Sequence, residues 1–167
     1  AAFPDVLSAL DFEAVIDGEL LIIREGEAAT FNDLQQRLNR KTVSEKQLAT
    51  LPAGVRAYDC LMLDRLDLRQ FSFLERRERL ESLLASRKVH RFDLSPMIAF
   101  ADWNELAEKR AAPPSPAVEG VMLKRKDSAY LPGRVKGLWW KWKRDPHLVD
   151  AVLMYAQRGH GKRSSFY

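Results

Sequence analysis

The amino-acid sequence predicts an α+β fold with a largely antiparallel sheet. Several strand-like segments follow one another without a helix between them, which favours antiparallel pairing over alternating strand and helix units. Helix start signals occur at three places along the chain. Apolar residues make up 46% of the 167 residues, so the chain can bury a sizeable core. Its length suits one domain, or one domain and a small part of a second.

The N-terminal third of the chain predicts a short helix, a strand region and a second helix. Residues 5–10 fit the end of a short helix. Residues 12–23 are rich in Val, Ile, Leu and Phe, and Asp17-Gly18 interrupts them. They therefore predict either two strand segments around a turn or bulge, or one kinked strand. The spacing of a capping box at the start of residues 30–40 predicts a helix there.

The middle of the chain predicts a strand over residues 55–63 and then the best-defined helix, over residues 72–86. Ser72 and Glu75 form a full capping box at its start. Hydrophobic residues then fall on one stripe of the helix and charged residues fall off it. The stripe comprises Phe73, Leu74, Leu80, Leu83 and Leu84, and the charged residues off it are Arg76, Arg77, Glu78 and Glu81.

The C-terminal part predicts one more helix and further strands. A capping box begins a helix over residues 102–112, and three prolines just after it end this helix. Residues 118–125 and 138–143 predict strands. Residues 148–157 alternate apolar and mixed side chains, which we interpret as a strand. A domain boundary is expected near residue 144.

Composition excludes several classes of protein. Twenty-seven Lys and Arg against 23 Asp and Glu give a net charge of +4, which permits a polyanionic partner without requiring one. One cysteine excludes a disulfide framework, and three widely separated histidines exclude an HxxxH zinc site. No apolar run approaches the roughly 18 residues of a membrane span, and no leader is evident. The sequence therefore predicts a reduced, soluble, intracellular protein.

Three short motifs indicate little when each is taken alone. The DGEL sequence at residues 17–20 would ordinarily mark a turn. An aromatic residue in an apolar strand, such as Tyr58, usually belongs to the core. A carboxylate at the start of a strand, such as Glu119, is usually solvated.

The segment Trp139-Trp140-Lys141-Trp142-Lys143 is more informative. In a strand, Lys141 and Lys143 point to one face and Trp140 and Trp142 to the other. Two lysines side by side repel each other, and an anion between them would relieve that repulsion. An amphipathic strand with a solvated lysine face explains the same pattern equally well.

Taken together, these motifs resemble the covalent nucleotidyltransferase superfamily, most closely the ATP-dependent DNA ligases and in particular their bacterial members. Residues 17–20 are similar to motif III, Tyr58-Asp59 to motif IIIa, residues 119–124 to motif IV and residues 140–143 to motif V. The resemblance covers essentially the whole chain. It implies an ATP-grasp-like nucleotidyltransferase domain of the DNA ligase type, with mostly antiparallel sheets and flanking helices.

The resemblance also implies roles for five residues. Glu19 and Glu119 would hold Mg²⁺, directly or through water, and Glu19 would also contact the ribose. Tyr58 would stack on adenine. Lys141 and Lys143 would bind the α-phosphate of ATP or AMP. Hard oxygen ligands suit Mg²⁺, and paired ammonium groups suit charge that grows during phosphoryl transfer.

By resemblance, the enzyme would transfer AMP from ATP to a lysine, then to a DNA 5′-phosphate, and then seal the nick. The nucleophilic lysine of this family lies in a K-x-D-G motif before motif III. No K-x-D-G occurs in these 167 residues, so we expect it upstream of Ala1 and expect this chain alone not to self-adenylate. Residues 1–143 would be the adenylation domain from motif III to motif V, and residues 144–167 the start of an oligonucleotide-binding (OB-fold) domain.

The expected partner is nicked duplex DNA, without any membrane, and the full-length enzyme is expected to be a monomer in the bacterial cytoplasm, associated with the nucleoid. Two other functions remain open. One is an RNA ligase or another covalent nucleotidyltransferase, such as a capping guanylyltransferase. The other is a non-catalytic nucleic-acid-binding module, in which the basic and aromatic C-terminal third contacts a backbone and stacks bases.

Overall fold

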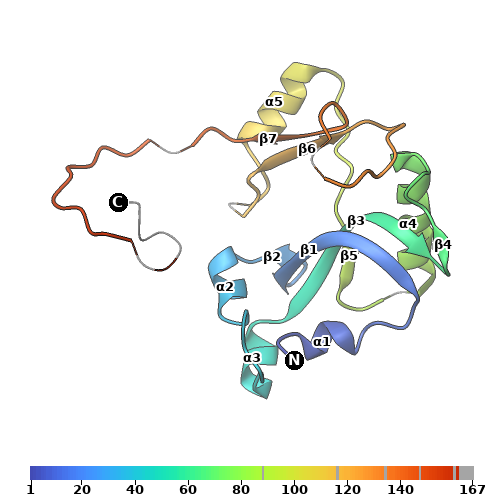
Figure 1. Ribbon diagram of the computed structural model, residues 1–167, viewed down its shortest axis with the longest axis horizontal. Coiled ribbons are helices and arrows are strands. Elements are labelled where there is room, and N and C mark those ends of the chain that lie inside the picture. The colour runs from blue at the N-terminus through green and yellow to red at the C-terminus, as the bar shows by residue number, and fades with distance from the viewer. Residues whose placement is uncertain (88, 116, 134, 147, 160, 162–167) are drawn as a thin grey trace.

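A computed structural model describes residues 1–87, 89–115, 117–133, 135–146, 148–159 and 161. In these residues the chain forms a five-stranded sheet, a separate two-stranded hairpin and five helices (Figure 1). The α+β class predicted from the sequence is confirmed. Figure 1 shows the hairpin with one helix above the larger sheet, and the remaining helices around that sheet.

The larger sheet is built around two long antiparallel strands, β1 (Ala14–Arg24) and β3 (Ala53–Leu63). Strand β2 (Glu27–Ala28) extends the β1 side, and β4 (Leu66–Asp67) pairs with the end of β3. Strand β5 (Phe92–Leu94) pairs with β3 in parallel. The sheet is thus mostly antiparallel, and β5 is an element that the sequence pattern did not reveal.

Strand β1 is one kinked strand, which settles the alternative that the sequence left open. Its register against β3 shifts between Val15 and Ile16 and again between Asp17 and Gly18. A Cβ atom at Gly18 would lie 2.9 Å from the carbonyl oxygen of Arg56, so only glycine allows this approach of the two strands. The irregularity thus coincides with the motif whose side chains are candidates for function.

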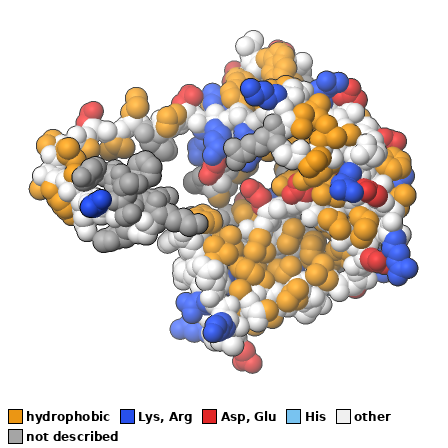
Figure 2. All heavy atoms as spheres, viewed as in Figure 1, with side chains coloured by type: hydrophobic (Ala, Val, Ile, Leu, Met, Phe, Trp, Pro, Cys, Tyr) orange, Lys and Arg blue, Asp and Glu red, His pale blue; other side chains and the backbone are white. Residues whose placement is uncertain are grey.

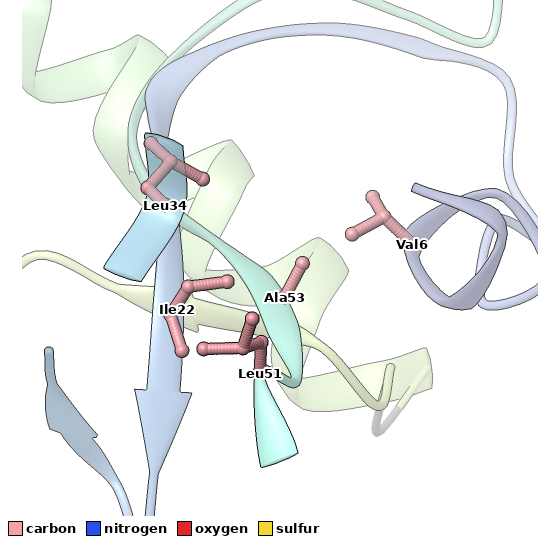
Figure 3. Packing of buried hydrophobic residues seen from close by; sticks show 5 residues of the cluster. All are labelled: Val6, Ile22, Leu34, Leu51 and Ala53. Atoms are coloured by element: carbon pink, nitrogen blue, oxygen red, sulfur yellow. The ribbon is translucent and has the colours of Figure 1, made fainter. Parts of the chain in front are cut away.

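Three short helices close one end of the sheet: α1 (Pro4–Leu7), α2 (Phe31–Gln35) and α3 (Glu45–Thr50). The predicted capping box of α2 is present, but the helix ends at Gln35 rather than near residue 40. Helix α3 was not predicted. Their contacts form a small core, shown in Figure 3, that consists of Val6, Ile22, Leu34, Leu51 and Ala53.

Helix α4 (Phe73–Arg87) packs against β3, and its buried face corrects the sequence-based stripe. Arg76 and Arg77 are 0% and 5% exposed, whereas Leu74 is 37% exposed. Helical spacing from Phe73 places positions 76 and 77 on the buried face. Charged side chains are tolerated there because Arg76 pairs with Asp59 and Arg77 donates to the Ser95 carbonyl. The second core lies here and comprises Ala57, Cys60, Leu68, Leu80 and Leu84.

The hairpin consists of β6 (Gly120–Lys124) and β7 (Trp139–Lys143), which pair antiparallel. Helix α5 (Trp103–Ala111) lies on one of its faces. The Trp103 and Trp142 rings pack edge to face, with centroids 6.5 Å apart. The Cζ atom of Arg110 lies 4.9 Å from the centroid of the Trp142 ring. Because Trp142 faces α5, the opposite face of the hairpin points away from α5.

The predicted strand over residues 148–157 is not formed. Residues 148–159 have no regular structure in the described part of the chain, and Leu148 is 97% exposed. A strand needs a neighbour for its backbone hydrogen bonds, and the described residues supply none to this segment. Part of the expected OB-fold start, at residues 147, 160 and 162–167, lies outside the described residues. No helix among the described residues is long and apolar enough to cross a membrane.

Candidate active site

The hairpin face that points away from α5 carries both lysines of the WWKWK segment. Lys141 pairs across the hairpin with Met122, and Lys143 pairs with Gly120. Trp139 lies two residues before Lys141 and therefore shares this face. A Cβ atom at Gly120 would overlap the carbonyl oxygen of Trp142, so glycine is required for β6 to lie this close to β7.

Glu119, just before β6, lies against these lysines. Its Oε2 atom accepts a hydrogen bond from the Lys143 Nζ atom at 2.7 Å, and both side chains are largely exposed. This bond, and then the nearby charges of Lys143 and Lys141, lower the pKa of Glu119. Two ammonium groups and one carboxylate therefore gather at an open surface, where a substrate could exchange with the ion pair.

Tyr58 of β3 is the aromatic residue of the candidate site, and its hydroxyl is tethered. It donates a 2.8 Å hydrogen bond to Oδ1 of Asp17. The Tyr130 hydroxyl donates to Oδ2 of the same carboxylate at 2.9 Å. Burial and then the bond to Asp17 raise the pKa of Tyr58, and the same causes raise the pKa of Tyr130 to about 12. Both tyrosines are thus neutral hydrogen-bond donors near pH 7.

Lys124, at the end of β6, lies within a cage of aromatic rings. Its Nζ atom is 4.3 Å from the ring centroid of Tyr58, 4.2 Å from that of Trp139 and 4.8 Å from that of Phe73. Asp59 Oδ2 is 4.0 Å away, and Nζ makes no hydrogen bond within the described residues. Burial lowers the pKa of Lys124 to about 8. The rings and the carboxylate stabilise a cation that water cannot reach.

Glu19 lies on β1, opposite Arg56 of β3, and its side chain is exposed. Its negative charge contributes, after Asp93, to the raised pKa of Arg56, and it also contributes to the raised pKa of Tyr58. Glu19 is therefore within electrostatic range of Tyr58. The two residues therefore lie on neighbouring, directly paired strands.

The structure thus places the five predicted site residues in two groups. Glu19 and Tyr58 belong to the larger sheet, while Glu119, Lys141 and Lys143 belong to the hairpin. Lys124 joins the groups, because it shares the hairpin face with Trp139 and the two lysines and also contacts the Tyr58 ring.

Glu19, Glu119, Lys141 and Lys143 are exposed and Tyr58 is partly buried, so the candidate site is open to solvent. Two shallow hollows occur in the described part of the chain, and neither is lined by a predicted site residue. One lies beside Gly54 and Phe92, and the other lies along α4 beside Arg79. The described residues contain no group of three or more acidic, histidine or cysteine side chains close enough to hold a metal ion. Figure 2 shows acidic side chains between the upper and lower parts of the molecule.

Comparison with known families identifies this arrangement. The chain matches the family described as "ATP dependent DNA ligase domain" over residues 2–143. The chain belongs to the ATP-dependent DNA ligase family. The match includes all four motifs and ends at the last residue of β7. The family predicted from the motifs is therefore confirmed, and so is its enzyme class.

Curated DNA ligases resemble the chain along nearly its whole length. DNA ligase 2 of Haloquadratum walsbyi is 32% identical over 155 residues, which cover 92% of this chain and 24% of that protein. The DNA ligase of Natronomonas pharaonis is 33% identical over 161 residues, with 96% and 28% covered. The chain therefore spans about a quarter of the length of these relatives.

Solved structures show the same fold. The ligase domain of Mycobacterium tuberculosis LigD has a TM-score of 0.58 and 28% identity, and the match covers 80% of this chain and 39% of that one. A mycobacterial DNA ligase D in complex with ATP and MES gives a TM-score of 0.56 at 27% identity, with 80% and 38% covered. A Lig E DNA ligase gives 0.60 at 26%, with 78% and 46% covered.

Sequence reasoning missed three contributors to the site. Tyr130 follows β6 in a loop and belongs to none of the four motifs, so only its spatial position reveals it. Lys124 was recognised only as the last letter of a motif, although a lysine that ends an apolar strand is itself a signal. Arg76 was assigned to the solvent-facing side of α4 because of its charge, whereas helical spacing alone would have placed it inside.

Proposed function

We propose that this chain supplies the nucleotide, metal and phosphate contacts of an ATP-dependent DNA ligase that seals nicks in duplex DNA through enzyme–AMP and DNA–adenylate intermediates. Membership of the ligase family supports this proposal. The observation that carries it is the contact of Lys124 with Tyr58, because Lys124 shares the hairpin face of Lys141 and Lys143. An aromatic platform and a pair of cations therefore flank the same junction, as binding of an adenine nucleotide requires.

In this proposal the Tyr58 ring stacks on adenine and Glu19 contacts the ribose. Tyrosine suits this role because its flat face tolerates small shifts of the base and its hydroxyl can be fixed from one side. Asp17 holds that hydroxyl at 2.8 Å, so the ring has little freedom to turn. The stacking surface is then in place before the nucleotide binds, which reduces the entropy lost on binding.

Lys141 and Lys143 would bind the α-phosphate. In the structure the Lys143 ammonium is engaged by Glu119. A phosphate that arrives between the two lysines would compete for Lys143 and release the Glu119 carboxylate. Phosphoryl transfer depends mainly on positioning and on neutralising charge, and preformed cations supply both.

Glu19 and Glu119 fit a Mg²⁺ ion in the chemistry of their oxygen donors. Mg²⁺ keeps several of its waters and commonly takes only one or two protein carboxylates together with substrate phosphates. Two exposed carboxylates on either side of the junction therefore suffice, without a cluster of three. Bound there, the ion would neutralise phosphate charge, while Lys141 and Lys143 orient the same group.

We also propose the wider setting of the chain. Residues 1–143 would form the adenylation domain from motif III to motif V, and residues 144–167 the beginning of an OB-fold domain. The end of the family match at residue 143 supports this boundary. Nicked duplex DNA would be the substrate of a monomeric full-length enzyme in the cytoplasm, associated with the nucleoid.

Nucleotide titration of the chain tests the proposal. We expect AMP and Mg-ATP to bind in calorimetry, and we expect Tyr58→Ala to weaken AMP binding. Tyr155→Ala is a matched control, because Tyr155 is 77% exposed on the C-terminal segment. Binding of single-stranded oligonucleotides with no binding of nucleotide would favour the non-catalytic module instead.

Self-labelling tests the proposed division of labour. The nucleophilic lysine of a K-x-D-G motif is not among the 167 residues. The chain incubated with radiolabelled ATP and Mg²⁺ should therefore remain unlabelled. Addition of an upstream segment that contains K-x-D-G should restore the label. An acid-labile AMP adduct on a lysine of this chain would contradict the assignment.

A further inference from the structure

One carboxylate joins the two parts of the candidate site. Asp17 of β1 accepts the Tyr58 hydroxyl from the neighbouring strand of the larger sheet, at 2.8 Å. It also accepts the Tyr130 hydroxyl, from the connection between β6 and β7, at 2.9 Å. Both of its oxygens are thus used, one for each part of the molecule. A solvated turn residue would not have this pattern of contacts.

We propose that Asp17 is a positioning residue that sets the adenine platform and the phosphate-binding hairpin at a fixed separation. The proposal rests on the function proposed above, in which Tyr58 stacks on adenine and Lys141 and Lys143 bind phosphate. Asp17 itself touches neither group. It acts through the two tyrosines.

On the platform side, the tether determines the direction of the Tyr58 ring. The hydroxyl is held by a carboxylate, and such charge-assisted bonds are shorter and stronger than neutral ones. The Lys124 ammonium lies 4.3 Å from the ring centroid, which restricts the ring further. A phenylalanine at position 58 would stack on a base equally well, so the hydroxyl serves orientation rather than contact area.

On the hairpin side, Tyr130 transmits the constraint to the lysines. Its ring lies edge-on against the Trp139 ring, with centroids 5.3 Å apart, and its backbone nitrogen donates to the Arg69 carbonyl at 2.8 Å. Trp139 is the first residue of β7 and lies on the same face as Lys141. A displacement of Tyr130 would therefore move the beginning of the strand that carries the phosphate ligands.

A purely structural role for Asp17 makes a different prediction. A residue that only holds the fold together would, when changed, weaken every ligand of the chain and lower its stability. A positioning residue instead affects a ligand that spans both parts and spares one that touches a single part. AMP carries both an adenine and a phosphate, whereas inorganic pyrophosphate carries no ring. The two probes therefore separate the two roles.

The experiment measures AMP and pyrophosphate binding by calorimetry for the wild-type chain and for Tyr58→Phe, Tyr130→Phe and Asp17→Ala, which removes the acceptor of both hydroxyls. Each tyrosine variant keeps its ring and loses one hydroxyl. We expect AMP affinity to fall by about tenfold in each, the size expected for loss of a hydrogen bond to a charged group. Pyrophosphate affinity should stay within about twofold of wild type. Tyr155→Phe is the matched control and should change neither.

A double-mutant cycle assigns the effect to Asp17. Because Tyr58→Phe and Asp17→Ala each remove the bond between Tyr58 and Asp17, the double variant should bind AMP no more weakly than Asp17→Ala alone. Equal losses for AMP and pyrophosphate, or additive losses in the cycle, would overturn the positioning role. So would AMP affinities within twofold of wild type in all three variants, although the proposed function would stand. Failure of the wild-type chain to bind AMP while it binds pyrophosphate would overturn the proposed function as well.

Discussion

Lys124 and Lys143 lie on the same face of one hairpin, yet their surroundings differ sharply. The Lys124 side chain is 8% exposed, whereas that of Lys143 is 63% exposed and pairs with an exposed carboxylate. Three aromatic rings enclose Lys124, so its charge serves the contact between the hairpin and the larger sheet. In the proposed function, Lys143 exchanges Glu119 for a substrate phosphate. On this face, the degree of burial therefore distinguishes a structural lysine from a candidate ligand-binding lysine, which residue type alone does not.

The same contrast holds for arginine pairs. Arg76 and Asp59 have fully buried side chains, and Arg76 also donates to the carbonyls of Phe71 and Ser128. Arg69 and Asp67 form a pair at the surface with an N–O distance of 2.6 Å, against 2.8 Å in the buried pair. Only the first pair connects α4, β3 and the connection between β6 and β7. Substitutions in the two kinds of environment should therefore differ in both size and type of effect.

The largest expected effect is the loss of the buried arginine. Arg76→Met would leave the Asp59 carboxylate buried without its main partner, and breaking such a pair typically costs about 3–5 kcal/mol of folding free energy. We expect the urea midpoint to fall accordingly. Arg69→Met is the matched surface control and should leave the midpoint unchanged. Equal shifts for the two variants would contradict the contrast.

The charge of Lys124 predicts a smaller, pH-dependent effect. The folded-state pKa is lowered to about 8, whereas an unfolded lysine titrates near pH 10.4. Burying the charge therefore destabilises the fold fully below pH 8, and the penalty disappears as pH rises to about 10.4. Relative to Lys124→Met, the wild-type chain should gain up to roughly 3 kcal/mol over this window. Urea unfolding of both proteins at pH 7, 8, 9 and 10 measures the difference; a constant difference would show that Lys124 is not desolvated.

Lys141 should affect rate rather than stability. In an enzyme that includes the K-x-D-G lysine, Lys141→Ala should slow adenylation by about 10²-fold, as expected for removal of one preorganised stabiliser. ATP binding should weaken less, because the contact tightens in the transition state. Single-turnover adenylation of Lys141→Ala and Lys143→Ala measures this. Wild-type rates in both variants would mean that the lysine face is only solvated.

The longer strands and helix α4 could be predicted, and the four motifs recognised, because each depends on a local sequence pattern. Strand alternation, for example, was enough to place Lys141 and Lys143 on the same face of β7. Sequence patterns were insufficient where a partner distant in the sequence decides whether a residue is buried or a strand forms. Helical spacing places Arg76 on the buried face of α4, but no spacing within the helix reveals Asp59 of β3, the partner that makes burial of this charge tolerable. Residues 148–157 have the alternation of a strand but no neighbour among the described residues with which to pair.

The hydrogen bond between Asp17 and Tyr130 could not be predicted from the sequence for the same reason. The two residues are 113 positions apart. Each lies in a turn-like sequence, where polar residues are common and do not by themselves indicate a contact. Periodicity cannot predict a contact between a strand kink and a distant connection. Motif letters indicated which residues matter. The contacts in the structure show how Asp17, Lys124 and Tyr130 relate those residues to one another.

The smallest stability effect is expected at the exposed ion pair, and it sharpens the contrast with Lys124 most directly. Glu119 and Lys143 are both largely exposed, so solvent screens their attraction and Glu119→Gln should leave the urea midpoint unchanged. The same substitution replaces one of the two proposed carboxylate donors for Mg²⁺ with a neutral amide, which binds the ion more weakly. In the adenylating enzyme, Glu119→Gln should therefore raise the Mg²⁺ concentration needed for half-maximal rate, while Glu108→Gln, on the outer helix α5, should not. An unchanged Mg²⁺ requirement together with a lowered urea midpoint would reverse the assignment and make the pair structural.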